Sequence, residues 1–282
     1  MNYRHAFHAG NFADVLKHTV LVGLLEALKG KPAPFCYVDT HAGRGVYDLR
    51  GEQAQQTREH QDGIQRLLSA ANLPGPLQRY VDLVRAFTPE PGPLAWYPGS
   101  PLLAARLMRD DDRAILCELQ PAEADALRAA LRADRRFAVH QRDGYEALGA
   151  LLPPAQKRGI VLVDPPYEAQ AGEFTLIEQS LEASLARWPN AIHAIWYPIK
   201  LRATILPFHR WLRSRAGSEG ALVAELLLHP DNSMLRLNGC GIAILNPPWQ
   251  FDRELASWLP ALEPLLAQGR YGGSRIERLL PA

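Results

Sequence analysis

Short apolar runs alternate along the chain with stretches in which apolar residues recur every three or four positions. The spaced patterns predict helices at 12–29 and near 121–132, 173–186, 203–214 and 252–267. The runs predict seven strands, which are PFCYVD (34–39), AILCEL (114–119), FAVHQ (137–141), GIVLVD (159–164), AIHAIWYP (191–198), ALVAELLLHP (221–230) and CGIAILNPP (240–248). Alternation of this kind predicts an α/β fold with a mostly parallel sheet covered by helices.

One interval breaks the alternation. Between Gly45 and Tyr97 the pattern shows no convincing strand, and two amphipathic stretches take its place, roughly 53–71 and 76–87. Pro- and Gly-rich segments separate and close them. We therefore expect residues 51–95 to form a helical insertion within one domain that spans residues 1–282.

The residues after the insertion support this interpretation. The segment PGSPLLAARL places Ser100 as a helix N-cap and Pro101 at the first helical position. Without the insertion, Gly43 and Glu118 are separated by about 30 residues, the scale of one βαβ unit. The insertion thus displaces the helix that ordinarily follows the first strand.

Composition adds a broad class. The chain has 282 residues, of which 47% are hydrophobic and 22% charged, as in soluble globular proteins. No run approaches the roughly 18 apolar residues of a membrane span, and the first residues lack the apolar core of a signal peptide. The three cysteines, at 36, 117 and 240, stand singly in apolar runs and indicate buried thiols in a reducing compartment. We expect a cytoplasmic protein.

The net charge is only +1, so the charge of the whole chain gives no prediction about nucleic-acid binding. Arginines do cluster locally in LRADRRF and FHRWLRSR, where solvated helix faces are the simpler interpretation. The N-terminal segment NYRHAFH interleaves aromatic and basic residues. RNA contact would need such a local basic face, since phosphate neutralisation supplies much of the affinity.

Acidic residues stand at the ends of four successive predicted strands. They are Asp39, Glu118, Asp143, which precedes Gly144, and Asp164. Because ligands of open α/β sheets bind beyond the carboxyl ends of the strands, we expect these acids to border a ligand site. Gly43 and Gly45 follow the first strand, but a bare GxG is equally consistent with a turn that binds nothing.

An acidic border repels a phosphate-rich dinucleotide and accommodates a positively charged nucleoside such as S-adenosyl-L-methionine. We assign Glu118 to the ribose hydroxyls and Asp143 to the adenine edge of this cofactor. Lys17, on the first helix, is a candidate for the methionine carboxylate, although a lone helical lysine is more often solvated.

The segment DPPY, residues 164–167, predicts the reactive half of the site. An exocyclic amine such as adenine N6 is a poor nucleophile, and two acceptors on its N–H groups localise its lone pair. Asp164 and the Pro165 carbonyl supply those acceptors on a backbone that prolines stiffen. Tyr167 stacks on the base, which must be unpaired or extruded.

A near-copy of this segment, NPPW at 246–249, competes for the same role. We expect Asn246 to end the last strand of the sheet, antiparallel and near the edge, and to point away from the site. The copy is then a turn that terminates a strand.

The histidines at 5, 8, 18 and 41 do not show the spacing of a metal site, and we expect no metal. Tyr3, Arg4, His5 and His8 form either a lip over the target base or a merely ordered terminus.

Several segments together resemble the bacterial 23S ribosomal RNA adenine-N6 methyltransferase family of the RlmJ type. They are YRHAFHAGNFADVLKH, VDTHAGRGVY, WYPGSPLLAARL, RDGYEAL, VLVDPPYE and NPPW. The resemblance implies a class I S-adenosylmethionine-dependent methyltransferase fold, a Rossmann-like seven-stranded sheet with a small helical insertion subdomain. It implies a monomer that methylates an unpaired adenine of 23S rRNA, at position 2030.

The resemblance also assigns residues. Its cofactor contacts fall on Lys17, His41, Ser100, Glu118 and the pair Asp143 and Gly144. The catalytic acid falls on Asp164, and a substrate contact falls on Tyr3.

Three other functions remain open from the residues. Adenine in DNA and the glutamine amide of a protein need similar acceptor chemistry from the same fold. An RNA-binding module without activity is a rival of another class, and it predicts that Asp164→Ala leaves function unchanged.

Overall fold

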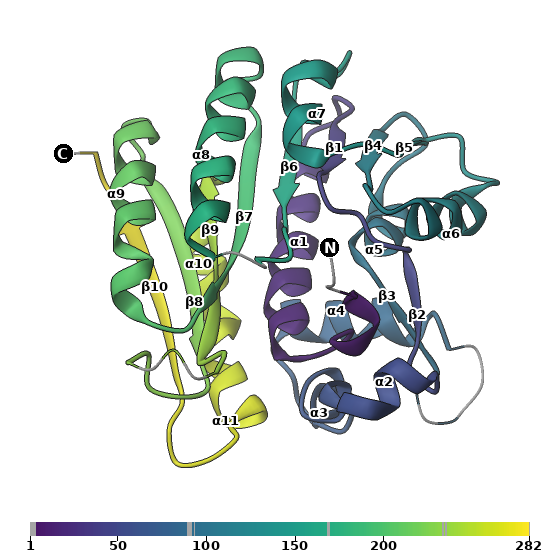
Figure 1. The fold of residues 1–282 in the computed structure, drawn as a ribbon, viewed down its shortest axis with the longest axis vertical. Helices are drawn as coiled ribbons and strands as arrows, with labels where there is room; N and C mark the ends of the chain where they lie inside the picture. The colour runs from purple at the N-terminus through teal and green to yellow at the C-terminus, as the bar shows by residue number, and fades with distance from the viewer. Residues whose placement is uncertain are drawn as a thin grey trace.

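The computed structural model describes residues 4–88, 92, 94–167, 170–232, 234 and 236–281. Its centre is a sheet with the strand order β10-β8-β9-β7-β6-β1-β4-β5 (Figure 1). The strands are β1 (Cys36–Asp39), β4 (Arg113–Cys117), β5 (Phe137–His140), β6 (Gly159–Val163), β7 (Ile192–Ile199), β8 (Ala221–Leu227), β9 (Gly239–Leu245) and β10 (Gly273–Leu279). The five from β5 to β7 are parallel neighbours. This confirms the Rossmann-like α/β prediction, with the ends of β1 and β6 side by side.

The expected number of seven strands in this sheet is wrong. An eighth strand, β10, pairs with β8 at the edge of the sheet. It carries the charged residues Arg275, Glu277 and Arg278, and most of it is only half-buried. A search for apolar runs misses an edge strand of this kind, because one of its faces remains in water.

Helices cover both faces of the sheet and enclose two cores. The residues of α1 (Phe12–Lys29), α5 (Ser100–Leu107), α6 (Pro121–Leu131), α10 (Phe251–Trp258) and α11 (Leu262–Leu266) contribute to one core. The residues of α7 (Gly144–Leu151), α8 (Gln170–Arg187) and α9 (Leu206–Arg215) contribute to the other. Strand β6 shows the separation, since Ile160 and Leu162 face the first core and Val161 and Val163 the second.

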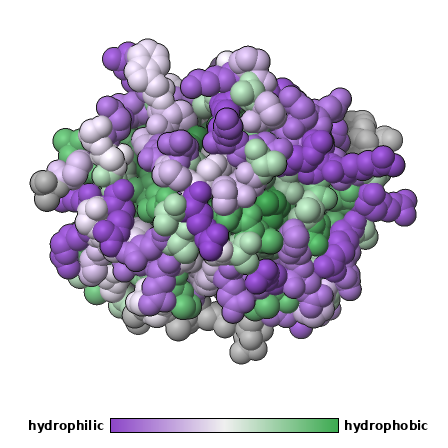
Figure 2. Space-filling model, turned by 90° about the horizontal axis from the view of Figure 1, so that it is seen from above, coloured by the Kyte–Doolittle hydropathy of each residue, from purple (hydrophilic) through white to green (hydrophobic). Residues whose placement is uncertain are grey.

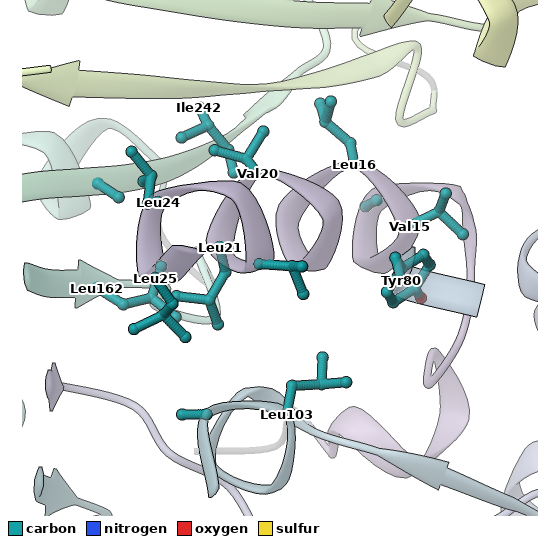
Figure 3. Close-up of a cluster of buried hydrophobic side chains, with 14 of the residues drawn as sticks. Val15, Leu16, Val20, Leu21, Leu24, Leu25, Tyr80, Leu103, Leu162 and Ile242 are labelled. Carbon is teal, nitrogen blue, oxygen red and sulfur yellow. The ribbon is translucent and has the colours of Figure 1, made fainter. Parts of the chain in front are cut away.

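Helix α1 is the central helix of the first core. Its N-cap is Asn11, and the Asn11 side chain accepts a hydrogen bond from the Asp14 amide at 3.0 Å. Figure 3 shows its apolar residues reaching Ile242 of β9 on one side and Leu103 of α5 on another. The helix is therefore buried nearly all round, and its polar residues need partners inside the protein.

The insertion is more broken than the two predicted helices. The stretch predicted at 53–71 forms α2 (Glu52–Thr57), a 3₁₀ turn η2 (Glu59–Gln61) and α3 (Ile64–Leu68), and α4 is Gly75–Arg85. Arg58 takes a left-handed conformation between the first two, with φ 53°. Gly63 packs against the backbone of Gly10, where an added Cβ would lie 2.1 Å from the Gly10 carbonyl oxygen.

The prediction of no strand between Gly45 and Tyr97 is also wrong. Strands β2 (Val46–Asp48) and β3 (Trp96–Pro98) pair antiparallel and close the insertion at its base. Three residues are too few for an alternating pattern to stand out in the sequence.

The remaining helices differ from the predictions at their ends. The stretch near 252–267 divides into α10, the 3₁₀ turn η4 (Leu259–Ala261) and α11, because Pro260 interrupts it. The stretch near 203–214 begins with a 3₁₀ turn, η3 (Arg202–Thr204), before α9. The eight-residue helix α7 was not predicted. It is the helix that begins at the acidic end of β5.

All three cysteines are buried and free, as expected. Burial raises the pKa of Cys36 and Cys117 to about 12 and also raises that of Cys240. Their thiols are therefore protonated at neutral pH.

The face in Figure 2 is largely hydrophilic, with hydrophobic residues showing between the polar ones over its middle. Such a mixture is ordinary for a folded surface. Among the described residues, none of the helices has the length and apolar character needed to cross a membrane.

Candidate active site

A cleft of about 970 Å³ opens at the carboxyl ends of the parallel strands. The described residues that were assigned a cofactor, catalytic or substrate role from the sequence all line it: Arg4, His5, His8, Lys17, His41, Gly43, Ser100, Glu118, Asp143, Gly144, Asp164, Pro165 and Tyr167. Tyr3 lies outside the described residues. The fold thus brings the predicted cofactor and reactive halves into one cavity, whose size is ordinary for a ligand site.

The glycine turn after β1 is built against Glu118. Gly43 and Gly45 have φ values of 61° and 85°, a conformation that favours glycine. The Gly43 amide donates to Glu118 Oε2 at 2.9 Å, and the Gln120 amide donates to Oε1 at 2.7 Å. Burial raises the pKa of Glu118. A carboxylate oxygen can accept two hydrogen bonds, and each Glu118 oxygen accepts one from these amides. Glu118 therefore keeps capacity for hydroxyl donors in the cleft.

Asp143 caps helix α7. Its side chain accepts from the amides of Tyr145 at 2.8 Å and Glu146 at 3.2 Å. Gly144 beside it packs against Thr40, where an added Cβ would lie 2.0 Å from the Thr40 carbonyl oxygen. The short strand-to-helix connection therefore fixes the carboxylate at the cleft wall.

Asp39 does not join the acidic border that the sequence predicted. It is fully buried and accepts from the Tyr37 hydroxyl at 2.5 Å, the Ser100 hydroxyl at 2.7 Å and the His41 amide at 3.2 Å. Burial raises its pKa. The acids that line the cleft at these strand ends are therefore Glu118, Asp143 and Asp164.

Ser100 also differs from its predicted structural role. It is the first residue of α5, and Gly99 is the N-cap. The Ser100 hydroxyl donates to Asp39, and this helix start has no side-chain cap that accepts from a backbone amide. Its contact with a cofactor stays a prediction.

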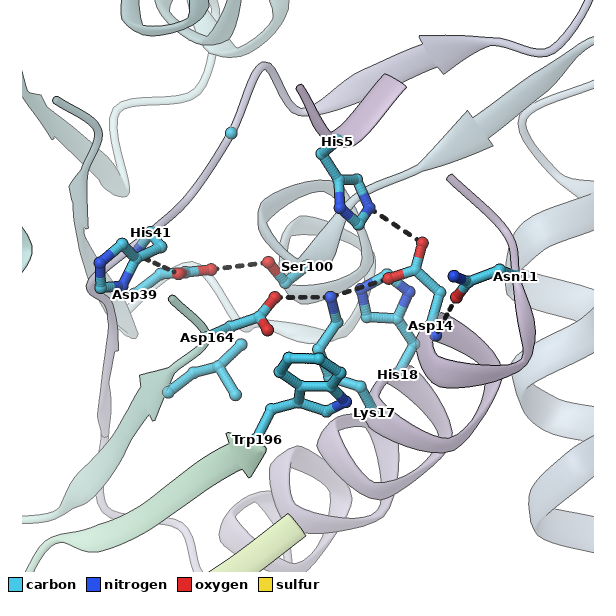
Figure 4. A network of polar contacts seen from close by, with 12 residues as sticks. His5, Asn11, Asp14, Lys17, His18, Asp39, His41, Ser100, Asp164 and Trp196 are labelled. Carbon is cyan, nitrogen blue, oxygen red and sulfur yellow. Dashed lines mark hydrogen bonds and ion pairs between the residues drawn. The ribbon is translucent and has the colours of Figure 1, made fainter. Parts of the chain in front are cut away.

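Asp164 follows β6 directly and forms an ion pair across the cleft floor. The Lys17 ammonium donates to Asp164 Oδ2 at 2.6 Å and to Asp14 Oδ1 at 2.8 Å. Asp14 Oδ2 accepts from the His5 ring at 2.9 Å and from the Gly10 amide at 2.8 Å. Figure 4 shows this line of charges running from the N-terminal segment to the end of β6.

The electrostatics of this line favour ionised partners. Burial opposes the charged form of Lys17, but Asp14 and Asp164 outweigh it and hold the lysine pKa well above its ordinary value. Burial likewise opposes ionisation of Asp14, and His5 and Lys17 outweigh it, so the Asp14 pKa lies well below its usual range. The predicted contact of Lys17 with a cofactor carboxylate stays a prediction, because two protein carboxylates already surround this ammonium.

His41 lies at the other end of the cleft floor. Its ring contacts Thr40 Oγ1 at 2.8 Å and meets the Tyr145 ring edge-on at 5.1 Å. Burial lowers its pKa to about 4, so the ring is neutral at pH 7. It offers a hydrogen-bonding group without charge beside Asp143.

Tyr167 is more enclosed than a stacking residue needs to be. Its φ is 50°, and its hydroxyl donates to the Trp196 carbonyl at 2.8 Å. The ring packs edge-on against Phe174 and Trp196 and is 7% exposed. The predicted stacking on a base stays a prediction, and in this conformation little of the ring faces the cleft.

The histidines of the N-terminal segment are held by separate carboxylates. His8 contacts Glu59 of the insertion at 3.0 Å, and this hydrogen bond raises the His8 pKa. His5 contacts Asp14 instead. Among the described residues no group of three metal-ligating side chains converges. Arg4, His5 and His8 line the cleft, so the segment has the position expected of a lip.

Asn246 lies at the end of the sheet where the parallel strands begin, opposite the cleft. Asn246 follows strand β9, which is antiparallel to β7 as expected. Strand β9 lies inside the sheet, between β8 and β7, and it is not the last strand, because β10 comes later in the chain. The Asn246 amide donates to the carbonyls of Pro189 and Ala191, which precede β7. The interpretation of NPPW as a structural turn agrees with these contacts.

Two residues of the cleft were missed as site residues. Asp14 was assigned no site role from the sequence, although a carboxylate three residues before Lys17 on one helix is a recognisable ion-pair spacing. Trp196 was treated as part of an apolar strand. Its position in the cleft depends on the length of β7 relative to β6, which the sequence does not display.

The fold and the cleft define a class I methyltransferase. The family model described as "Ribosomal RNA large subunit methyltransferase D, RlmJ" matches residues 32–279. The chain is 38% identical to Ribosomal RNA large subunit methyltransferase J of Escherichia coli K12 and 37% identical to the protein of that name from Haemophilus influenzae, each over 100% of this chain and 99% of the relative.

A solved structure agrees with these relatives. The crystal structure of protein LPL1258 from Legionella pneumophila has a TM-score of 0.87 and 34% identity, and the match covers 96% of this chain and 98% of that one. The chain belongs to the RlmJ family of ribosomal RNA large subunit methyltransferases.

Proposed function

We propose that this protein transfers a methyl group from S-adenosylmethionine to N6 of an unpaired adenine in 23S ribosomal RNA, acting as a monomer. Membership of the RlmJ family supports the reaction class and the RNA substrate. The observation that supports N6 of adenine as the target atom is the position of Asp164, which lines the cleft next to Pro165 and together with Glu118.

The cleft fits a cationic nucleoside cofactor. Carboxylates at three strand ends border it, and Gly43 and Gly144 stand where a Cβ would meet neighbouring atoms at 2.3 and 2.0 Å. Glu118 would hold the ribose hydroxyls, and Asp143 would accept from the adenine amino group. When bound, the cofactor supplies an electrophilic methyl group on a positively charged sulfur.

Asp164 and Pro165 would orient the target amine. Lys17 occupies Oδ2 of Asp164, and the contacts among the described residues leave Oδ1 available to accept an N–H. The Pro165 carbonyl would accept the second N–H, so that the nitrogen lone pair is localised away from the ring. The 2.6 Å contact with the Lys17 ammonium holds the Asp164 carboxylate in place, which suits a preorganised acceptor.

The test compares three substrates and one substitution. Deproteinised 23S rRNA, intact large subunits and duplex DNA are incubated in parallel with labelled cofactor, and the modified nucleoside is identified by mass spectrometry. We expect N6-methyladenosine in rRNA. Turnover on DNA alone would overturn the substrate assignment.

Asp164→Asn tests the role of the acceptor. We expect transfer to fall by at least about 100-fold, on the scale of a lost transition-state contact, with affinity for S-adenosylhomocysteine kept. Asp125→Asn, at an exposed ion pair on α6, is the matched control. Unchanged transfer by Asp164→Asn would show that this carboxylate is not the acceptor, whereas RNA binding without any transfer by the parent would favour the binding-module alternative.

A further inference from the structure

Strand β7 extends past the strand that carries the reactive segment. It pairs with β6 from Ile192 to Ile195, in a register that places Ile195 opposite Val163. From Trp196 to Ile199 it pairs with β9 alone among the described strands. The last residues of β7 therefore stand beyond the end of β6 and form a wall beside Asp164.

The side chains of this wall alternate between two environments. Tyr197 and Ile199 are fully buried in the core that contains α9. Trp196, Pro198 and Lys200 line the cleft. Successive residues of a strand point to opposite faces, so these three form one strip along the cleft wall. We call residues 196, 198 and 200 the β7 strip.

The strip begins beside Asp164. Because Val163 pairs with Ile195, the next residues, Asp164 and Trp196, are neighbours at the strand ends. The Tyr167 hydroxyl fixes the Trp196 carbonyl at 2.8 Å, and the two rings meet edge-on at 5.6 Å. Figure 4 shows the indole of Trp196 next to Asp164 and Lys17.

The far end of the strip carries a positive charge. The Lys200 carbonyl accepts from the Asn238 side chain at 2.5 Å, which anchors the backbone below the ammonium. The next basic residue, Arg202, is committed to Glu225 and Asp231 at 2.7 and 2.6 Å. Lys200 is thus the cation that β7 presents to the cleft.

The strip lies on the side of Asp164 away from the cofactor acids. In the sheet, β7 is on one side of β6, whereas β4 and β5, which carry Glu118 and Asp143, lie beyond β1 on the other. An aromatic ring beside the reactive carboxylate and a cation about four residues further along match the base and the phosphate of one nucleotide.

We propose that the β7 strip is the binding site of the target nucleotide, with the Trp196 indole against the base and the Lys200 ammonium on a phosphate of the RNA strand. The proposal rests on the proposed function and adds residues to it. It assigns to Trp196 the stacking role that the sequence analysis gave to Tyr167, since the Tyr167 ring is enclosed.

The test uses Trp196→Leu, which keeps an apolar side chain but removes the aromatic ring, and Lys200→Ala. Trp249→Ala and Lys157→Ala are the controls. Trp249 is 87% exposed near Asn246, and Lys157 precedes β6. Both therefore lie at the end of the sheet where the parallel strands begin, away from the cleft. We expect Trp196→Leu to raise the KM for rRNA roughly 10-fold or more, the scale of one base stack. Cofactor affinity and the controls should stay within about twofold of the parent.

Lys200→Ala should weaken RNA binding and reduce the slope of log affinity against log salt by about 0.7, the value for one phosphate of a single strand. Binding is measured with an oligonucleotide that holds one unpaired adenine, in the presence of S-adenosylhomocysteine, so it does not depend on turnover. Thermal unfolding identifies any variant that fails to fold. If Trp196→Leu does not fold, Lys200→Ala still tests the proposal, because the Lys200 side chain is only half-buried.

The outcomes separate the two proposals. Parent-like RNA affinity and KM in both variants, with an active parent enzyme, would overturn the strip and leave the proposed function intact. A loss of cofactor affinity equal to the loss of RNA affinity would also overturn it. A parent chain that methylates no RNA and binds no adenine oligonucleotide would overturn both.

Discussion

His18 is a buried base whose charge state ties stability to pH. Its ring nitrogen Nδ1 forms a hydrogen bond with the Tyr97 hydroxyl at 2.7 Å, and burial lowers the pKa of His18 to about 3. In the unfolded chain a histidine titrates near pH 6.5. Below that pH the unfolded state binds a proton that the folded state does not, so stability is kept above pH 6.5 and lost as pH falls toward 3.

We expect the His18 contribution to cost about 2 kcal/mol between pH 6.5 and 5, from the slope of about 1.4 kcal/mol per pH unit for one proton. His18→Gln removes this site, so its free energy of unfolding should depend less steeply on pH over that range. Urea unfolding at pH 5, 6 and 7 measures the slope. An identical slope in parent and variant would contradict the assignment.

Gly43 combines a left-handed backbone with a crowded neighbour. An added Cβ would lie 2.3 Å from the Tyr47 hydroxyl, and the next ring atom is 3.6 Å away. Gly43→Ala should therefore cost about 1–3 kcal/mol of stability. In Gly43→Ala/Tyr47→Phe the clash is gone and about 1–2 kcal/mol of left-handed strain remains.

A double-mutant cycle by urea unfolding measures this coupling. We expect Tyr47→Phe to be better tolerated in the Gly43→Ala background than in the parent. Strictly additive effects of the two substitutions would show that the Tyr47 hydroxyl does not limit the turn.

At the scale of elements, helix α1 supports the site by its burial. Leu21 is 1% exposed in the core shared by α1 and the sheet. Leu21→Ala should lower the free energy of unfolding by about 2–5 kcal/mol, because the cavity would be enclosed on all sides. Leu176→Ala on α8, at 47% exposure, is the control and should change it by less than about 0.5 kcal/mol. Chemical denaturation of both variants checks the difference.

The elements that the sequence predicted correctly are those whose pattern is long or apolar on both faces. Helix α1 and strands β1, β6 and β7 were placed within one or two residues, because their burial leaves a continuous signal. The elements that were missed are short, as β2 and β3 are, or half in water, as β10 is. Their positions depend on pairing partners that no local pattern names.

The site divides in the same way. Asp164, Glu118 and Asp143 were predictable because strand ends of a parallel sheet converge on one edge. Asp39 shares that sequence signature but turns inward to three donors. Only the arrangement of Tyr37 and Ser100 around it distinguishes a structural carboxylate from one that faces a ligand.

At the scale of the whole molecule, the insertion shares its core with the sheet. Ile64 of α3 and Tyr80 of α4 belong to the same buried cluster as α1. The Ile64 amide donates to the Gly10 carbonyl at 2.8 Å, and Arg66 reaches the Ala267 carbonyl at 2.6 Å. The insertion is therefore expected to unfold together with the rest of the chain.

Ile64→Ala tests this cooperativity. All six tryptophans lie outside residues 51–95, so their fluorescence reports on the main body, whereas far-UV circular dichroism reports on every helix. We expect the two signals to give one coincident transition in the parent, and Ile64→Ala to shift both equally. A variant in which only the dichroism signal moves would show that the insertion melts alone.

The three enclosed thiols have a practical consequence. Burial raises the pKa of Cys36 and Cys117 to about 12 and raises that of Cys240 above its ordinary value. A maleimide or iodoacetamide reagent at pH 7 therefore has almost no native thiolate to attack. A single cysteine placed on the exposed surface of the lip or the insertion would then accept a spectroscopic label selectively. Distances between two such labels could be followed during RNA capture without first rebuilding the protein on a cysteine-free background.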